Sequence, residues 1–374
     1  MKSTVVSRTD GSIFGKWMWT VDRWLLGIIL ILAAFGIVMS FSSTRVNAER
    51  LGYDTYHFVV RHAFFLAIAL VVMLIVSMLR PRTIRRLGVL TLLGAFGMMM
   101  LLPFFGTNIK GGTRWIYLFG VSVQPSEFAK PAFAVVTAWL MSLELQEKRW
   151  RAKAAAWAVF AILAGTLLSQ PDVGMTLTVS AIFFAELFVS GLSMFWCSLL
   201  GFIGMVLPVP FYYTLPHFRA RIDKFINPEQ NDTFQIKTAM EAFKSGGFLG
   251  RGPAEGVVKK ILPDAHTDFI FAVIAEEYGI LICLAVVALF AVFIVRGLLL
   301  VMKDKNPFIL YAVTGLMTQF GVQAFVNISS ALGMIPTKGM TLPFISYGGS
   351  SLVSLGLAAG MILGLTRSSQ RNDL

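Results

Sequence analysis

Residues 24–43 read WLLGIILILAAFGIVMSFSS, a stretch without a single charged side chain. A helix that crosses the hydrocarbon core of a bilayer needs about 20 predominantly apolar residues, so this stretch predicts a membrane span. It is too long for the apolar core of a signal peptide, and no clear cleavage site follows it. We therefore expect residues 1–23, which include Lys16 and Arg23, to form a cytoplasmic tail ahead of an uncleaved first span.

Similar apolar runs recur along the rest of the 374-residue chain. Hydrophobic residues make up 56% of the sequence and charged residues only 14%, and the mean hydropathy is +0.73. These values exclude a soluble globular enzyme and a disordered or coiled-coil protein. They predict an all-α polytopic membrane protein with ten transmembrane helices in one domain over 24–366, and a cytoplasmic tail at 367–374. The predicted spans are 24–43, 58–79, 87–105, 127–145, 154–169, 174–190, 194–215, 269–300, 307–328 and 350–366.

Basic residues are distributed unevenly between the predicted loops. The net charge is +12, and Lys and Arg gather in the N-terminal tail and near 80–86, 148–153, 296–305 and 367–371. These segments lie on one side of the predicted membrane, which the positive-inside rule makes cytoplasmic, and both termini lie there. The basic excess therefore indicates topology and contact with anionic lipid. Nucleic-acid binding is not expected.

The opposite, outer face carries the longer loops, where function concentrates. They are residues 106–126, 170–172, 216–268 and 329–349. The segment 216–268 is nearly neutral, with eight Lys or Arg residues against seven Asp or Glu residues. Within it, Ile236, Met240 and Phe243 recur at helical spacing, which predicts a short amphipathic helix started by Asp232. This helix either lies on the outer leaflet or packs on the bundle.

Ionisable residues within or beside spans are candidate functional residues, because burying a charge in lipid costs about 2.5–3.5 kcal/mol on insertion scales. Glu127 and Lys130 stand at the outer mouth of the fourth span, three residues apart and therefore on one helical face. Such a pair neutralises itself, so it is either a structural ion pair or a substrate contact. Upstream, Lys110 and Arg114 lie beside Trp115, which suits an anionic headgroup and is equally typical of a membrane anchor.

A second polar cluster stands at the outer edge of the eighth span. Asp268 lies where water still reaches, as a general base must, whereas Glu276 lies about 12 Å deeper and within about 80° of the same face. Glu277 points nearly opposite to Asp268, so the two glutamates cannot do the same job, and one is expected to brace neighbouring helices. Asp268 is the better chemical candidate. A carboxylate favoured by the helix macrodipole is the alternative explanation of its position.

The third cluster is the irregular segment 336–351, which contains two prolines and three glycines. Irregular backbone at membrane depth must line a cavity, because lipid offers no hydrogen-bond partners. Gly348 and Gly349, followed by the Ser350 hydroxyl, present free N–H groups at a helix start. Such groups can hold a phosphate, with Lys338 as counter-charge. An ordinary capped turn explains this pattern equally well.

Together these polar residues predict an outward-facing pocket for an anionic, lipid-linked substrate. Four scattered histidines do not suggest a zinc site, and the two cysteines lie inside apolar runs without a metal or disulfide pattern. Nothing in the sequence resembles a nucleotide site or a Ser-His-Asp arrangement. The residues alone leave open whether the pocket performs chemistry or transport.

Five motifs, in this order and at this spacing, resemble the SEDS family (shape, elongation, division and sporulation) over almost the whole chain. The segment 336–339 reads Pro-Thr-Lys-Gly, and with Thr341 it is similar to the division branch, whereas the elongation branch usually has Val-Thr before this glycine. Asp264 and Ala239 depart from the family, which more often has Glu and Ser there. The motifs are 113–116, 124–127 with Lys130, 170–174, 266–271 with 276–277, and 335–351.

The resemblance implies a peptidoglycan glycosyltransferase of the bacterial inner membrane that polymerises lipid II at the division septum and releases undecaprenyl pyrophosphate. It implies a class B penicillin-binding protein and other divisome membrane proteins as partners. It also implies that Asp268, in the long periplasmic loop 216–268, is the catalytic aspartate. By the same resemblance, the expected cavity and substrate-binding residues are Arg114, Glu127, Lys130, Asp172, Lys338, Ser346, Gly348, Gly349 and Ser350.

The expected mechanism uses Asp268 to take the proton of the acceptor hydroxyl, a form of help typically worth about 10²–10⁴-fold in rate. The departing pyrophosphate needs positive charge from fixed cations, backbone amides or a divalent ion such as Mg²⁺ or Mn²⁺, so no cofactor is predicted firmly. A lipid II flippase, an elongation-branch (RodA-like) polymerase and a non-catalytic division scaffold are the alternatives. The gathering of polar residues at the outer mouth favours the enzyme.

Overall fold

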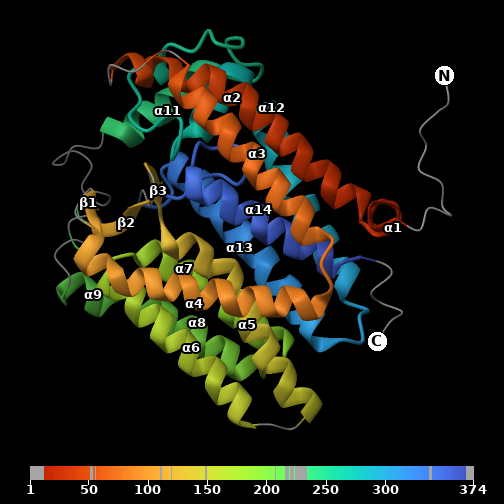
Figure 1. Ribbon diagram of the computed structural model, residues 1–374. Helices are drawn as coiled ribbons and strands as arrows, with labels where there is room; N and C mark the ends of the chain where they lie inside the picture. The colour runs from red at the N-terminus through yellow and green to blue at the C-terminus, as the bar shows by residue number, and fades with distance from the viewer. Residues whose placement is uncertain are drawn as a thin grey trace, which may run out of the picture.

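The computed structural model is a bundle of long helices with one small sheet (Figure 1). It describes residues 12–50, 54, 56–109, 112–118, 120–147, 150–206, 208–214, 219, 223, 234–336 and 339–367. The helices are α1 (Ile13–Thr20), α2 (Arg23–Arg50), α3 (His57–Ser77), α4 (Pro81–Phe105), α5 (Pro125–Glu147), α6 (Trp150–Ser169), α7 (Val173–Val189), α8 (Met194–Val206), α9 (Pro208–Thr214), α11 (Phe234–Gly246), the 3-10 helix η1 (Val258–Lys260), α12 (Ile270–Val301), α13 (Pro307–Ala331) and α14 (Gly349–Leu365). The strands are β1 (Thr107–Ile109), β2 (Gly112–Leu118) and β3 (Val121–Val123).

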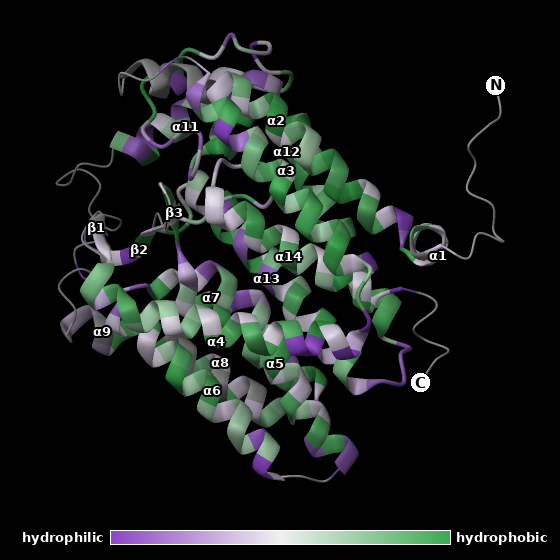
Figure 2. Ribbon diagram, in the orientation of Figure 1, coloured by the Kyte–Doolittle hydropathy of each residue, from purple (hydrophilic) through white to green (hydrophobic). Residues whose placement is uncertain are grey.

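The helices α13 and α14 lie centrally, between a group formed by α2, α3 and α12 and a group formed by α4 to α8 (Figure 1). Buried residues occupy most of α5 and α13, whereas α4 and α6 turn most of their side chains outward. The outward side chains are apolar, as Leu90, Leu93 and Ile162 illustrate, and hydrophobic colouring runs along these helices in Figure 2. An apolar outer surface is what a lipid environment requires, because lipid cannot hydrogen-bond polar groups.

Seven of the described helices are long and apolar enough to cross a membrane. They are α2, α3, α4, α5, α6, α12 and α13, and they fall on the predicted spans one to five, eight and nine. The predicted sixth and tenth spans correspond to α7 and α14, apolar helices of 17 residues each. The predicted seventh span is divided between α8 and α9. The chain is thus a mostly helical, multi-pass membrane protein, and the count of ten spans stays a prediction.

Glycines at regular spacing bring α14 close to α3. Gly356, Gly360 and Gly364 follow one another at intervals of four residues and therefore lie on one face of α14. A Cβ atom on Gly356 would collide with the carbonyl oxygen of Ala69, and one on Gly360 would lie 2.7 Å from that of Met73. Small residues at such a contact let two membrane helices approach closely, and here they bring the middle and the end of α14 against α3.

The predicted loop 106–126 contains a three-stranded antiparallel sheet in the order β1-β2-β3, which the sequence analysis did not foresee. Thr107 pairs with Trp115 and Ile116 with Val123, and Gly120, at φ +78°, lies in the turn between β2 and β3. The strands are short, and only β-branched and aromatic residues such as those of β2 hint at them. The sheet holds Arg114 on a defined element instead of a flexible loop.

The predicted amphipathic helix exists as α11, and the expectation that it packs on the bundle is confirmed, because α11 packs on α12. Of the predicted apolar residues, Phe243 lies at this contact, partly buried against Phe271, whereas Met240 is exposed. The fully buried part of the face consists of small residues, namely Thr238, Ala239, Ala242 and Gly246. The close approach favours small side chains, since a Cβ atom on Gly246 would collide with α12 backbone. Asp232, the predicted start of the helix, lies outside the described residues.

Candidate active site

A cavity of about 590 Å³ opens at the end of the bundle that holds the sheet and α11. Side chains from all three predicted polar clusters line it, as the sequence analysis expected of an outward-facing pocket. Of the predicted site residues, those that line it are Arg114, Glu127, Asp172, Asp268, Gly348, Gly349 and Ser350. Lys130 and Ser346 are buried beside the cavity, and Lys338 lies outside the described residues.

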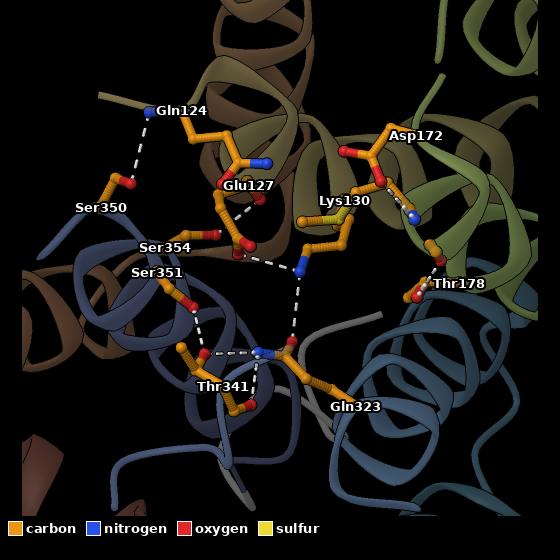
Figure 3. A network of polar contacts seen from close by, with 12 residues as sticks. Gln124, Glu127, Lys130, Asp172, Thr178, Gln323, Thr341, Ser350, Ser351 and Ser354 are labelled. Atoms are coloured by element: carbon orange, nitrogen blue, oxygen red, sulfur yellow. Dashed lines mark hydrogen bonds and ion pairs between the residues drawn. The ribbon is translucent and has the colours of Figure 1, made fainter. Parts of the chain in front are cut away.

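Glu127 and Lys130, near the start of α5, form an ion pair (Figure 3). Lys130 Nζ lies 2.9 Å from Glu127 Oε2 and donates a hydrogen bond of 3.2 Å to Gln323 Oε1 on α13. Glu127 is 5% exposed and Lys130 only 1%. The pair is therefore the structural ion pair that their spacing predicts, while the Glu127 carboxylate also borders the cavity.

Arg114 on β2 binds the turn that begins α7. Its Nε and Nη2 donate to the carbonyl oxygens of Gln170 and Pro171 at 3.1 and 2.6 Å, and its Nη1 lies 3.7 Å from Asp172 Oδ2. Asp172 caps α7 by accepting the Met175 N–H on Oδ1. Burial raises the pKa of Asp172 above its ordinary value, and the Arg114 guanidinium opposes that rise. Two predicted site residues thus form one ion-paired unit on the wall of the pocket.

Asp268 lies in a tight turn just ahead of α12. The N–H groups of Thr267, Asp268 and Phe269 all donate to the carbonyl oxygen of Asp264, at 3.1 to 3.3 Å. Phe269 occupies the cap position of α12, so Asp268 precedes the helix by two residues. A Cβ atom added to Gly339 would lie 3.6 Å from Asp268 Oδ2, so this carboxylate lies beside the segment that begins at Gly339.

Glu276 and Glu277 anchor the same segment, 257–259, so the expectation that the two glutamates cannot do the same job is wrong. The Glu276 carboxylate accepts three backbone N–H groups, from Val257, Val258 and Lys259, at 2.6 to 2.9 Å. The Glu277 carboxylate pairs with the Lys259 ammonium and accepts the hydroxyl of Ser42 on α2. Bracing is thus confirmed, and it applies to both glutamates. Together they bind the segment that leads to Asp268 onto α12 and α2.

The segment 339–349 closes the pocket opposite the sheet. Ser346 donates to the carbonyl oxygen of Thr267 at 2.7 Å and accepts the Leu342 N–H at 2.8 Å, so it links this segment to the Asp268 turn. Ser350 accepts the N–H of Gln124 at 3.3 Å. The first N–H groups of a helix have no partner within it, and α14 begins at Gly349 on the cavity wall.

Three polar residues at this site were not predicted from the sequence, namely Arg61, Gln323 and Asn327. Arg61 lines the cavity from α3, and an arginine inside a predicted span was a signal that could have identified it. Gln323 donates to the carbonyl and hydroxyl oxygens of Thr341 at 3.1 and 3.2 Å, and Thr341 contacts the Ser351 hydroxyl (Figure 3). Asn327, one turn further along α13, donates to two backbone carbonyl oxygens at the site. Neutral amides within an apolar span were the available signal for both.

Deeper in the bundle, one more buried polar pair joins α5 and α7. Thr137 Oγ1 lies 2.6 Å from Glu186 Oε2, and both residues are fully buried. Neither lines the cavity. A Cβ atom on Gly315 would collide with the Glu186 carboxylate, so α13 packs closely against this pair.

The described residues offer no metal site built from protein ligands alone, because no three His, Cys, Asp or Glu side chains gather closely enough. Mg²⁺ often binds through one or two carboxylates together with substrate phosphates. The carboxylates of Asp172, Asp264 and Asp268 line the cavity separately, so no reaction step is assigned to a metal here.

Comparisons with known proteins agree over nearly the full chain. The family described as "Cell cycle protein" (FTSW_RODA_SPOVE) has a model that matches residues 23–371. A protein of Caulobacter vibrioides named "Probable peptidoglycan glycosyltransferase FtsW" is 45% identical over 362 residues, which cover 96% of this chain and 93% of that protein. A protein of Geobacter metallireducens with the same name is 35% identical over 361 residues, with 92% and 95% covered.

Solved structures share the architecture. A chain from "Structural coordination of polymerization and crosslinking by a peptidoglycan synthase complex" has a TM-score of 0.76 at 24% identity, covering 95% of this chain and 99% of its own. The rod shape determining protein RodA of Thermus thermophilus has a TM-score of 0.69 at 24% identity, covering 92% and 96%. At these identities the likeness concerns the fold alone.

Proposed function

The chain belongs to the FtsW/RodA/SpoVE family of cell cycle proteins, and we propose on this premise that it polymerises lipid II into peptidoglycan glycan strands at the division septum. The family resemblance seen in the sequence is confirmed, and the FtsW names of its relatives agree with the division branch. The chain is a peptidoglycan glycosyltransferase embedded in a membrane. One observation supports the placement of its active site: a single cavity brings the Asp268 carboxylate together with two arginines and the start of α14.

Asp268 is the proposed general base. The acceptor hydroxyl oxygen attacks the anomeric carbon of the donor sugar, and the bond from that carbon to the pyrophosphate oxygen breaks. Asp268 takes the hydroxyl proton as the new glycosidic bond forms, and undecaprenyl pyrophosphate leaves with the bonding electrons. A positioned base typically contributes about 10²–10⁴-fold to such a step. The position of Asp268, partly exposed on the cavity wall and ahead of α12, suits this role.

Positive charge for the departing pyrophosphate comes mainly from Arg61, which lines the same cavity as Asp268. Arg114 lines it too, but its guanidinium already binds Asp172 and two carbonyl oxygens. Preorganised donors of this kind stabilise charge as it develops and need no reorganisation during the reaction. The N–H groups at the start of α14 add further donors. Lys130 contributes less directly, because Glu127 and Gln323 already bind its ammonium group.

The pocket is proposed to face the periplasm, because basic residues gather in the loops at the other ends of the helices. The proposed partner is a class B penicillin-binding protein, together with other divisome membrane proteins, as the family resemblance implies. A fold neighbour described as part of a peptidoglycan synthase complex is consistent with such an assembly.

Lipid II transport is the second candidate function. The pair formed by Thr137 and Glu186 favours it, because polar residues then extend below the pocket into the bundle. Both residues are fully buried, and neither lines the cavity, so they do not open a polar path for a headgroup. The enzyme therefore remains the better supported function.

Polymerisation of labelled lipid II in detergent solution tests the proposal, with the chain purified together with its partner protein. Detergent removes the two sides of a membrane, so transport cannot produce a signal there. Long glycan products that a muramidase degrades would support the polymerase. Their absence from an intact, folded complex, combined with lipid II movement across proteoliposomes, would establish transport instead.

A further inference from the structure

Asn327 on α13 binds both sides of the pocket at once. Its Nδ2 donates to the carbonyl oxygen of Asp268 at 3.0 Å and to that of Met340 at 2.6 Å. The residue is only 1% exposed, and its partners lie 59 residues before it and 13 residues after it in the chain. One buried amide therefore joins the turn of the proposed base to the segment that faces it.

The two hydrogen bonds use both N–H donors of the Asn327 side chain. A side-chain amide carries two N–H donors, and Asn327 gives one to each carbonyl oxygen. Both partners are acceptors only, which fixes the orientation of the amide group. Its Oδ1 is buried without a hydrogen-bond partner among the described residues, so the two donated bonds alone decide where the amide lies.

The two carbonyl oxygens belong to the residues that set the surroundings of the Asp268 carboxylate. One is Asp268 itself. The other, Met340, follows Gly339, the residue against which Asp268 Oδ2 lies. Two further links, from Ser346 to Thr267 and from the Tyr347 N–H to the His266 carbonyl oxygen, join neighbouring residues of the same two segments. Of these links, only the one made by Asn327 reaches Asp268 itself, through its carbonyl oxygen. Asn327 also anchors both segments to α13.

We propose that Asn327 is a positioning residue for glycan polymerisation, which holds the Asp268 carboxylate at its working distance from the segment 339–349. This inference rests on the proposed role of Asp268 as the base. Asn327 touches no reacting atom; it acts through the main chain of Asp268. A displacement of about 1 Å at a reacting group can cost about 10²-fold in rate, so loss of this link should reduce turnover strongly.

The decisive variant is Asn327→Asp, which keeps the size of the side chain and removes the amide donors. An ionised carboxylate donates to neither carbonyl oxygen and a protonated one to only one of them, so at least one of the two links is lost. We expect kcat for lipid II polymerisation to fall about 30- to 100-fold, with KM unchanged within about twofold, because the cavity lining stays intact. Asn327→Gln keeps both donors on a longer arm and should regain part of the lost kcat.

Gln319→Glu is the matched control. Gln319 lies two turns earlier on the same helix, is fully buried, and its amide has no hydrogen-bond partner among the described residues. The exchange is chemically the same, amide to acid, but it breaks no link to the pocket. Each variant is first checked for the wild-type unfolding temperature and for retention of its partner. Asp268→Asn is assayed in parallel.

We expect Asn327→Asp to lose kcat selectively and Asn327→Gln to recover part of it. Gln319→Glu should show near-normal kinetics, and Asp268→Asn should be inactive. Near-normal kinetics in folded Asn327→Asp would overturn the inference while an inactive Asp268→Asn left the proposed function standing. Equal losses in Asn327→Asp and Gln319→Glu would also overturn it, because burying an acid would explain both. Full activity in Asp268→Asn would remove the proposed base and, with it, the premise for Asn327.

Discussion

Lys130 Nζ lies between Glu127 Oε2 at 2.9 Å and Gln323 Oε1 at 3.2 Å, so this buried ammonium group is bound by protein oxygens on two sides. A buried charge is tolerated when it is paired and hydrogen-bonded. Lys130 fulfils both conditions while joining α5 to α13. This arrangement makes it a residue on which the whole pocket depends structurally, in addition to any effect on the substrate.

Replacing Lys130 by Met is expected to destabilise the protein strongly, because it leaves the Glu127 carboxylate buried without its cation. Removal of one partner from a buried ion pair costs about 3–5 kcal/mol. The double variant Glu127→Gln with Lys130→Met removes both charges and should recover most of that loss. Unfolding temperatures measured in detergent compare the three proteins.

The control for this prediction is Lys153→Met, which breaks the half-exposed pair of Lys153 with Glu144. Surface pairs contribute about 0–1 kcal/mol, so this variant should unfold close to the wild type. Similar losses in Lys130→Met and Lys153→Met would contradict the structural role assigned to the buried pair.

Asp172→Asn tests whether burial or the attraction to Arg114 has the larger effect on the pKa of Asp172. Burial raises the pKa of this carboxyl above the ordinary 3.8, so the folded protein holds the proton more tightly than the unfolded chain. Stability contributed by this group therefore increases as the pH falls through the raised pKa toward the ordinary value. The variant keeps an oxygen to accept the Met175 N–H but does not titrate.

Unfolding temperatures of the wild type and of Asp172→Asn are measured from about pH 8 down to about pH 3, a range that spans the ordinary carboxyl pKa. As the pH falls, the unfolding temperature of the wild type is predicted to rise relative to that of the variant. The opposite trend would mean that attraction to Arg114 outweighs burial, and that the ionised form of Asp172 is the favoured one in the fold.

Gly279→Ala is expected to destabilise the region around the proposed base. Gly279 interrupts α12 at φ 75° and ψ 178°, and a Cβ atom there would collide with the carbonyl oxygen of Phe248. Non-glycine residues in such conformations cost on the order of 1–3 kcal/mol. Gly94→Ala in α4 is the matched exchange, since nothing lies within 4 Å of its added Cβ atom, and it should be neutral or mildly stabilising. Thermal unfolding that ranked Gly94→Ala as the worse variant would contradict this account of α12.

The sequence predicted what depends on local spacing and missed what depends on distant partners. Glu127 and Lys130 are three residues apart, and their pairing followed from helix geometry alone. Arg114 and Asp172 were both predicted as site residues, but their contact joins residues 58 positions apart, and spacing could not reveal it. The three strands are too short for their residue pattern to be distinguished from that of an irregular loop.

The face of α11 shows why side-chain size can matter more than hydrophobicity. Apolar periodicity predicted the helix correctly, yet its contact with α12 uses small residues because the two backbones lie close together. Asn327 shows a related limit. A neutral amide within an apolar span marks Asn327 as a candidate in the sequence, but only the structure shows which two carbonyl oxygens it binds.

Asp268 is the proposed base of a lipid II polymerase, and a product assay with matched variants decides whether it has this role. The wild type, Asp268→Asn, Asp264→Asn and the exposed-site control Glu255→Gln are purified with the partner protein and given labelled lipid II under identical conditions. Glycan strands from the wild type and Glu255→Gln, with none from a folded Asp268→Asn, is the predicted result. Strands from Asp268→Asn at the wild-type rate would contradict the claim, and their loss in Asp264→Asn alone would move the base to that residue.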